Sequence, residues 1–97
     1  MRQKDPIRIG EALDEFFRSS PTIARKIAEA RISDYWPQLV GDVIASYTTK
    51  LEVRSGRLHV NIASSVARNE VFMRREALKN AINHTSGMEL ITTIIVK

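Results

Sequence analysis

Two alternating segments joined by Ser55-Gly56 restrict the fold more than any other feature of this sequence. From Thr48 to Arg54, apolar and charged residues alternate with a period of two, which is typical of a half-buried strand. Ser55-Gly56 predicts a two-residue hairpin loop, since glycine adopts the positive φ that such a turn needs. The expected register pairs Val53 with Leu58, Leu51 with Val60 and Thr49 with Ile62 on the buried face, and Arg54 with Arg57, Glu52 with His59 and Lys50 with Asn61 outside.

Helical patterns precede the hairpin. Residues 9–18 predict a short amphipathic helix. Ser20 is placed to cap a second helix that begins at Pro21 and runs to about Tyr35, where Pro37 would interrupt or kink it. A third short helix is expected over residues 38–46, with Gly41 permitting close packing.

One long helix and one strand are expected after the hairpin. Ser64 or Ser65 would cap a helix that runs to about His84, with Gly87 at its C-terminal cap. A helical wheel gives it one broad apolar arc: Val66, Ala67, Val71, Met73, Ala77, Leu78, Ala81 and Ile82. Residues 90–96 are apolar on both faces, which predicts a strand in the middle of the sheet or at a covered edge. The order is α-α-α-β-β-α-β, an α+β class.

Length and composition limit the possible functions. A chain of 97 residues is expected to form one domain over residues 1–97, with residues 1–8 flexible. The absence of cysteine, of a signal peptide and of a membrane-length apolar run predicts a cytoplasmic protein without membrane contact. The charge of +4 is uneven, because residues 1–46 hold seven Lys/Arg and seven Asp/Glu, whereas residues 47–97 hold eight and four. The second half is therefore expected to face an anionic partner.

Basic side chains of the second half form two predicted groups. Arg68, Phe72, Arg75 and Lys79 recur at spacings of four, three and four on the long helix, so the cations could follow phosphates while the ring stacks on a base. The alternative is that Phe72 packs beneath the N-terminal helices and that the cations form a solvated face. At the hairpin, Lys50, Arg54 and Arg57 are candidates for nucleic-acid contact, because Arg54 and Arg57 repel each other unless an anion or solvent separates them.

Other polar and aromatic residues suggest structural roles or partner contacts. Glu70 and Arg74 are expected to form an ion pair. Tyr35 and Trp36 are candidates for binding a partner, although a single Trp in an apolar helix is more often part of the core.

The sequence offers no catalytic or metal-binding motif. His59 is expected to pair with Glu52 on the surface, His84 lies at a helix end, and neither has a nucleophile beside it. There is no GxxxxGK[ST] or GxGxxG, and two histidines without cysteine give no zinc pattern. We therefore expect no enzymatic activity, no cofactor and no metal.

An ordered set of short motifs resembles a known bacterial family. Tyr35-Trp36-Pro37-Gln38-Leu39-Val40-Gly41 is similar to a W-P-x-[hydrophobic]-V-G segment, and Gly56-Arg57-Leu58-His59-Val60-Asn61-Ile62 to a G-x-L-x-V-x-V strand. Ser64-Ser65 and Met73-Arg74-Arg75-Glu76 resemble the start and centre of its long helix. The family is DciA, and the resemblance covers the chain from about Ile9 to Lys97.

The resemblance implies a KH-like fold and a role in DNA replication. DciA-like proteins bind single-stranded or structured DNA and help a DnaB-type replicative helicase onto DNA without ATP hydrolysis, so DNA and the helicase are the implied partners. This chain has Ala67 where the family often has Trp, lacks the tail of larger members, and contains no G-x-x-G loop. A protein-interaction module or a KH-like RNA-binding protein without a loader role are the alternatives.

Overall fold

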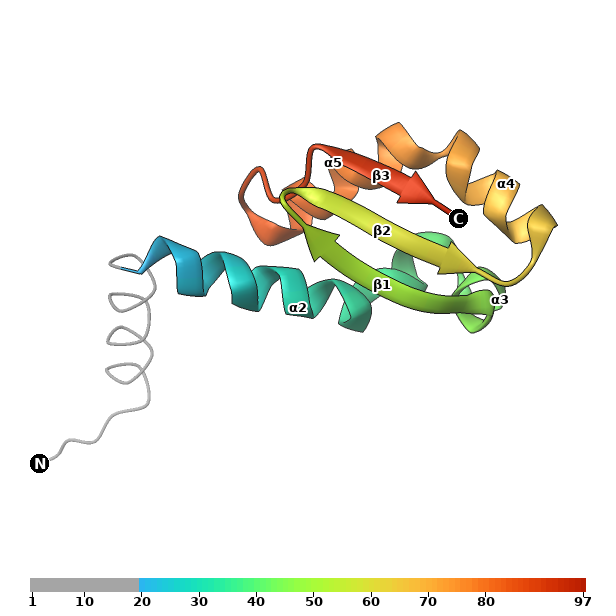
Figure 1. Ribbon diagram of the computed structural model, residues 1–97, viewed down its shortest axis with the longest axis horizontal. Helices are drawn as coiled ribbons and strands as arrows, with labels where there is room; N and C mark the ends of the chain where they lie inside the picture. Colours follow the sequence, from blue (N-terminus) through green and yellow to red (C-terminus); the bar gives the residue numbers. More distant parts are fainter. Residues whose placement is uncertain (1–19) are drawn as a thin grey trace, which may run out of the picture.

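The computed structural model describes residues 20–97 as one helical layer packed against a three-stranded sheet (Figure 1). The elements are α2 (Pro21–Val40), α3 (Asp42–Tyr47), β1 (Thr48–Arg54), β2 (Arg57–Ile62), α4 (Ser65–Met73), α5 (Arg75–Ser86) and β3 (Thr93–Val96). The α+β class is confirmed. The helix expected over residues 9–18 lies outside the described residues.

The sheet has the order β1-β2-β3, with β1 and β2 antiparallel and β2 and β3 parallel. The hairpin register is confirmed for five of the six expected pairs, from Arg54 opposite Arg57 to Lys50 opposite Asn61. The pairing of Thr49 with Ile62 was wrong, because a bulge between Thr48 and Lys50 places Thr48 opposite Ile62. Thr48 is fixed there by its hydroxyl, which accepts a hydrogen bond from Trp36 Nε1 and donates one to Ile44 O, each at 3.0 Å.

The turn at Ser55-Gly56 is confirmed, with positive φ at both residues. Ser55 has φ 53° and Gly56 has φ 76°, the pattern of the turn whose twist matches that of the flanking strands. The turn is also tied to the segment before β3, since Gly56 O accepts hydrogen bonds from Thr92 N at 2.7 Å and Thr92 Oγ1 at 3.1 Å.

Of the two effects predicted for Pro37, an interruption or a kink, the interruption was wrong, because α2 continues through Pro37 to Val40. The chain turns instead at Gly41, which has φ 94° and ψ 156°, a backbone conformation restricted to glycine. Close packing is not the reason for this glycine, since a Cβ at Gly41 would have nothing within 4 Å. Ser20 occupies the N-cap position of α2 as expected, but its side chain makes no capping hydrogen bond.

The single long helix after the hairpin was also wrong, because it divides at Arg74 into α4 and α5. Ser64 caps α4 as expected, its Oγ accepting from Ala67 N at 3.2 Å, and Gly87 ends α5 with φ 75°. At the break, Arg74 Nη2 donates to Leu39 O at 2.9 Å. The ion pair expected between Arg74 and Glu70 was wrong, since these two side chains form no ion pair.

The buried side of α4 and α5 is narrower than the predicted apolar arc. The helical wheel places Val66, Met73 and Ala77 together at one edge of that arc, and the prediction counted them as core. Val66 and Met73 are instead 80% and 74% exposed, and Ala77 is exposed too. The core side of the two helices consists of Ala67, Val71, Leu78 and Ile82, with Ala81 half-buried.

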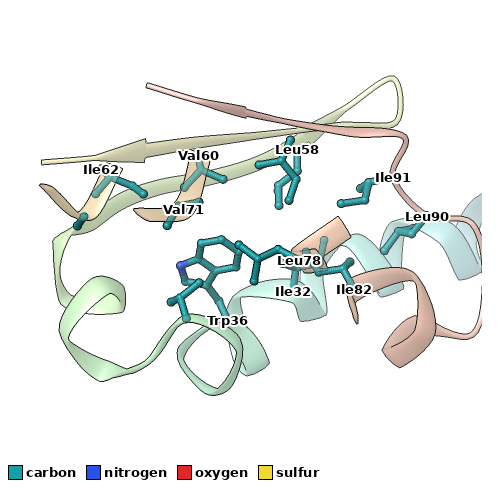
Figure 2. Close-up of a cluster of buried hydrophobic side chains, with 13 residues drawn as sticks. Ile32, Trp36, Leu58, Val60, Ile62, Val71, Leu78, Ile82, Leu90 and Ile91 are labelled. Atoms are coloured by element: carbon teal, nitrogen blue, oxygen red, sulfur yellow. The ribbon is translucent and has the colours of Figure 1, made fainter. Parts of the chain in front are cut away.

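The core lies between the sheet and the helices (Figure 2). Leu58, Val60 and Ile62 of β2 point from the sheet towards Trp36 and Ile32 of α2. The remaining core members are Val40, Ala67, Val71, Leu78, Ile82, Leu90, Ile91 and Ile94. Burial of these apolar side chains is the main source of stability, at about 1.5–3 kcal/mol for each large one.

β3 is shorter than expected and lies at the edge of the sheet, so of the two predicted positions, the middle of the sheet or a covered edge, the middle was wrong. Leu90 and Ile91 precede the strand and are held by Asn83 of α5. The Asn83 Oδ1 accepts from Leu90 N and Ile91 N, and its Nδ2 donates to Ile91 O, each at 2.9 Å. One amide side chain thus replaces the strand partner that these two residues lack.

Candidate nucleic-acid interface

One face of the sheet carries no helix of the described chain (Figure 1, Figure 2). Since side chains alternate along each strand, the residues between the core positions point to this open sheet face. They are Lys50, Glu52 and Arg54 from β1, Arg57, His59 and Asn61 from β2, and Thr93, Ile95 and Lys97 along β3. Four cations and one carboxylate give the open sheet face a net charge of +3 when His59 is neutral.

The carboxylate of Glu52 is shared between two neighbours on its own strand. Lys50 Nζ lies 3.2 Å from Glu52 Oε1, and Arg54 Nε lies 3.5 Å from Oε2. The hydrogen bond and positive charge of Lys50, with a smaller effect from Arg54, lower the pKa of Glu52. Glu52 is opposite His59 in the register, as expected, but no ion pair joins the two side chains.

His59 lies on the middle strand, at the centre of the open sheet face. Its ring is half-buried, and Nδ1 is buried without a hydrogen-bond partner in residues 20–97. Burial, followed by the positive charges of Arg54 and Lys97, lowers the pKa of His59, and Glu52 offsets this only in part. The neutral form of His59 is therefore favoured at neutral pH.

The two hairpin arginines are adjacent and exposed. Arg54 and Arg57 are the last pair before the turn, and both side chains are exposed. No carboxylate of the described chain forms an ion pair with Arg57. Two guanidinium groups on paired residues at an exposed turn can both donate hydrogen bonds to one oxyanion, such as a phosphate.

The second predicted group, which we call the stripe, is spread across the break between α4 and α5 and consists of Arg68, Phe72, Arg75 and Lys79. Phe72 is 48% exposed, and Arg75 Cζ lies 4.0 Å from the centre of its ring. Arg75 Nη1 also donates to Phe72 O at 2.8 Å. Phe72 therefore does not pack beneath α2, and with Arg75 it forms an exposed aromatic–cation pair.

The other two stripe residues have structural partners. Arg68 Nη2 donates to Ile62 O at 3.0 Å, and its Nε is buried without a partner in the described chain. Lys79 Nζ lies 3.1 Å from Glu76 Oε1, and its side chain is only 24% exposed. A hollow of about 270 Å³ lies beside α4 and β3 and is lined by Ser65, Arg68, Asn69, Phe72 and Val96.

The structure therefore places the sequence-predicted cations in two groups. Lys50, Arg54 and Arg57 lie on the open sheet face, whereas the stripe lies in the helical layer behind it. Lys97 and His59 belong to the first group but were missed as candidates. The strand alternation of residues 93–97 was the available signal for Lys97, and the position of His59 opposite Glu52 was the signal for the histidine.

The two partner-binding candidates lie in different environments. Trp36 is 2% exposed and donates from Nε1 to Thr48 Oγ1. Its side chain therefore belongs to the core, which was the alternative prediction for this residue. Tyr35 is half-buried beside a hollow of about 590 Å³ between α2 and the end of α5. We call this the α2–α5 hollow, and its lining is Ala24, Ile27, Ala28, Arg31, Tyr35, Thr85, Ser86 and Met88. Burial raises the pKa of Tyr35, whose hydroxyl has no partner within residues 20–97.

The described residues form a small α+β domain with two basic surfaces. Within residues 20–97, no three His, Asp or Glu side chains form a metal-binding cluster. None of the described helices is both long and apolar enough to cross a membrane.

Residues 8–96 match the protein-family model described as "Dna[CI] antecedent, DciA", so the chain belongs to the DciA family. The resemblance inferred from the sequence motifs is confirmed. Members of this family are non-enzymatic helicase loaders, and membership implies a role in loading the DnaB helicase during replication. No curated protein and no solved structure matches the chain.

Proposed function

We propose that this protein is a cytoplasmic, DNA-binding accessory of replication that assists loading or recruitment of a DnaB-type helicase. The family supplies the helicase partner. We propose in addition that residues 1–97 act as one domain and that the fold is KH-like, which the helix pair between the hairpin and β3 supports. Because the segment between α4 and α5 contains no G-x-x-G, phosphate would be bound by side chains rather than by such a loop.

The main support for the DNA-binding proposal is the positive charge of the open sheet face. Lys50, Arg54, Arg57 and Lys97 share this face with one carboxylate, that of Glu52, which is paired with Lys50 and Arg54. Residues two apart on a strand are about 7 Å apart, so the face extends about 13 Å from Arg57 to the level of Lys97. This length matches the axial rise of about four nucleotides of one DNA strand.

The pair of Phe72 and Arg75 supports a second contact with nucleic acid. A half-exposed ring with a guanidinium over it offers a stacking surface next to a cation, and base stacking on such a ring is worth about 1–3 kcal/mol. Since Arg68 and Lys79 are engaged within the fold, we assign them a supporting role at this surface.

The proposal is tested by titrating a labelled single-stranded oligonucleotide at two salt concentrations. Contact through about four cations should give a slope of log affinity against log salt near −3, or about fifty-fold weaker binding at 200 mM than at 50 mM salt. The double variant Arg54→Ala, Arg57→Ala should reduce affinity and make the slope shallower by about 1.4.

A matched control removes the same charge from the helical layer. Lys26 and Arg31 are exposed on α2, away from the open sheet face, and their double alanine variant should retain the wild-type slope. Absence of binding by the wild-type chain at low salt would refute the DNA-binding proposal. Competition between matched RNA and DNA strands separates a DNA-binding from an RNA-binding protein.

The second candidate function is a protein-interaction module, and the α2–α5 hollow favours it. The hollow is lined mainly by apolar side chains, with Ile27 38% exposed at its rim and Tyr35 beside it. A helicase segment could dock there without any contact to DNA. Capture of the purified helicase by a chain that shows no oligonucleotide binding at low salt would favour this function over the first.

A further inference from the structure

The centre of the open sheet face holds a titratable side chain, His59, which has no part in the phosphate contacts proposed above. His59 is bordered by Arg54 and Glu52 on β1, by Arg57 and Asn61 on its own strand, and by Ile95 and Lys97 along β3. Lys50 on β1 and Thr93 on β3 lie diagonally across from it on the same face, so four of the neighbouring side chains are cations. A bound anion on this face would lie next to the imidazole.

We propose that the open sheet face binds the phosphodiester backbone of nucleic acid around His59, and that His59 takes up a proton when the phosphates bind. The proposal rests on the proposed function and adds a proton-linked group to it. Nucleic-acid binding at this face is then stronger at lower pH.

The geometry around His59 supplies the mechanism. In the free protein, burial and the charges of Arg54, Lys97 and Arg57 all favour the neutral ring, and only Glu52 favours the charged one. Phosphate oxygens would neutralise those cations and attract a proton to the imidazole, which reverses the balance. Nδ1 is buried without a partner in the described chain, so the second N–H of the charged ring would be unsatisfied, and the free protein favours the neutral ring for this reason too.

A nucleic-acid backbone fits this face better than an acidic protein does. Protein interfaces depend on a buried apolar centre formed by a few large side chains. Ile95 is the one large aliphatic residue of the open sheet face, whereas its cations are distributed along both outer strands and the turn. A row of phosphates needs distributed cations and no apolar anchor.

The sign of the pH effect follows from the two states of His59. The free ring titrates below its ordinary value of about 6.5, and the bound ring titrates higher. The extra affinity is complete below the free pKa and is lost as the pH rises through the bound pKa. An upward shift of one unit corresponds to about tenfold tighter binding at the acidic end.

The test is an NMR titration of the histidine rings in the full-length wild-type chain, with and without an oligothymidylate of about 12 nucleotides. The chain has two histidines, so His59 and His84 are readily distinguished, and His84 in the helical layer serves as the internal reference. We expect the titration midpoint of His59 to rise by about one unit or more when the oligonucleotide is present.

Affinity measurements between about pH 5.5 and 8 complete the test. The pH dependence should be lost in His59→Gln and kept in His84→Gln. An unchanged His59 midpoint in the bound state, with the same pH profile in His59→Gln, would overturn the inference and leave the proposed function standing. No oligonucleotide binding at any pH would instead remove the proposed function itself. A shift caused by polyglutamate but not by the oligonucleotide would overturn the inference in favour of an acidic protein partner.

Discussion

Arg74 connects the two halves of the helical layer through one hydrogen bond. Its Nη2 donates to Leu39 O at 2.9 Å, and this carbonyl belongs to the last turn of α2, where carbonyl groups have no partner within the helix. Arg74 is also the residue at which α4 ends and α5 begins. Its side chain therefore fixes the position of the helix break relative to α2.

Replacing Arg74 with Ala should destabilise the fold by about 1.5–3 kcal/mol, the range for a hydrogen bond from a charged donor. Urea unfolding measures the change in the free energy of unfolding. Arg31→Ala, at an exposed arginine of α2, is the control and should stay within about 0.5 kcal/mol of wild type. Equal losses in the two variants would show that the Leu39 contact contributes nothing specific.

Each basic surface contains one carboxylate, and this pair of residues distinguishes the surfaces. Glu52 lies among the cations of the open sheet face, and Glu76 pairs with Lys79 behind it. If phosphates bind the open sheet face, Glu52→Gln should tighten oligonucleotide binding about two- to tenfold and steepen its salt dependence, because a repulsive charge is removed. Glu76→Gln should then have little effect.

The comparison of Glu52→Gln with Glu76→Gln also tests whether the helical layer is the main contact. Both substitutions remove one negative charge, so the net charge of the chain rises equally in the two variants. A larger gain for Glu76→Gln would transfer the main contact to Phe72, Arg75 and Lys79. Fluorescence anisotropy at two salt concentrations is sufficient for this measurement.

Among the elements, the break between α2 and α3 depends on backbone conformation alone. Gly41 has φ 94° and ψ 156°, which is accessible to glycine and very unfavourable for any other residue, whereas Gly87 has φ 75° and ψ 16°, which Asn also adopts. A Cβ would meet nothing within 4 Å at either position. Substitutions at the two glycines therefore differ in backbone strain but not in steric contact.

Gly41→Asn should destabilise the protein by about 1–3 kcal/mol, and Gly87→Asn by less than about 1 kcal/mol. Thermal and urea unfolding of both variants measure this difference. Similar losses would mean that the chain relaxes at Gly41 and that the break does not depend on glycine.

The elements also show which parts of the fold the sequence could predict. Strand alternation and turn chemistry are local, so the hairpin, its turn and most of its register followed from Thr48–Arg54 and Ser55-Gly56. The break at Arg74 could not be predicted in this way, and the side chain at the break donates to a carbonyl of Leu39, 35 residues earlier in the chain. Continuation of α2 through Pro37 likewise depends on packing, with Trp36 and Val40 buried on either side of it.

At the scale of the whole molecule, the sheet separates the candidate surfaces. The open sheet face lies on one side, and the α2–α5 hollow lies within the helical layer on the other. The charge pattern predicted the hairpin cations as a site. It could not show that the stripe on α4 and α5 is a separate surface, since this depends on which face of the sheet the helices cover. A partner at the hollow and a nucleic acid at the open sheet face could therefore bind together.

Two sets of variants should therefore separate helicase binding from DNA binding. Ile27→Asn changes the rim of the α2–α5 hollow without changing the charge, and should weaken binding to the purified helicase about tenfold or more while oligonucleotide affinity stays within about twofold. Ile23→Asn, at an equally exposed isoleucine of α2 that does not line the hollow, is the matched control and should change neither affinity. Arg54→Ala with Arg57→Ala should show the reverse pattern, losing the oligonucleotide and keeping the helicase.

Loss of both partners in each variant would mean that helicase and DNA share one surface. The proposal of two binding surfaces on opposite sides of the sheet would then be refuted.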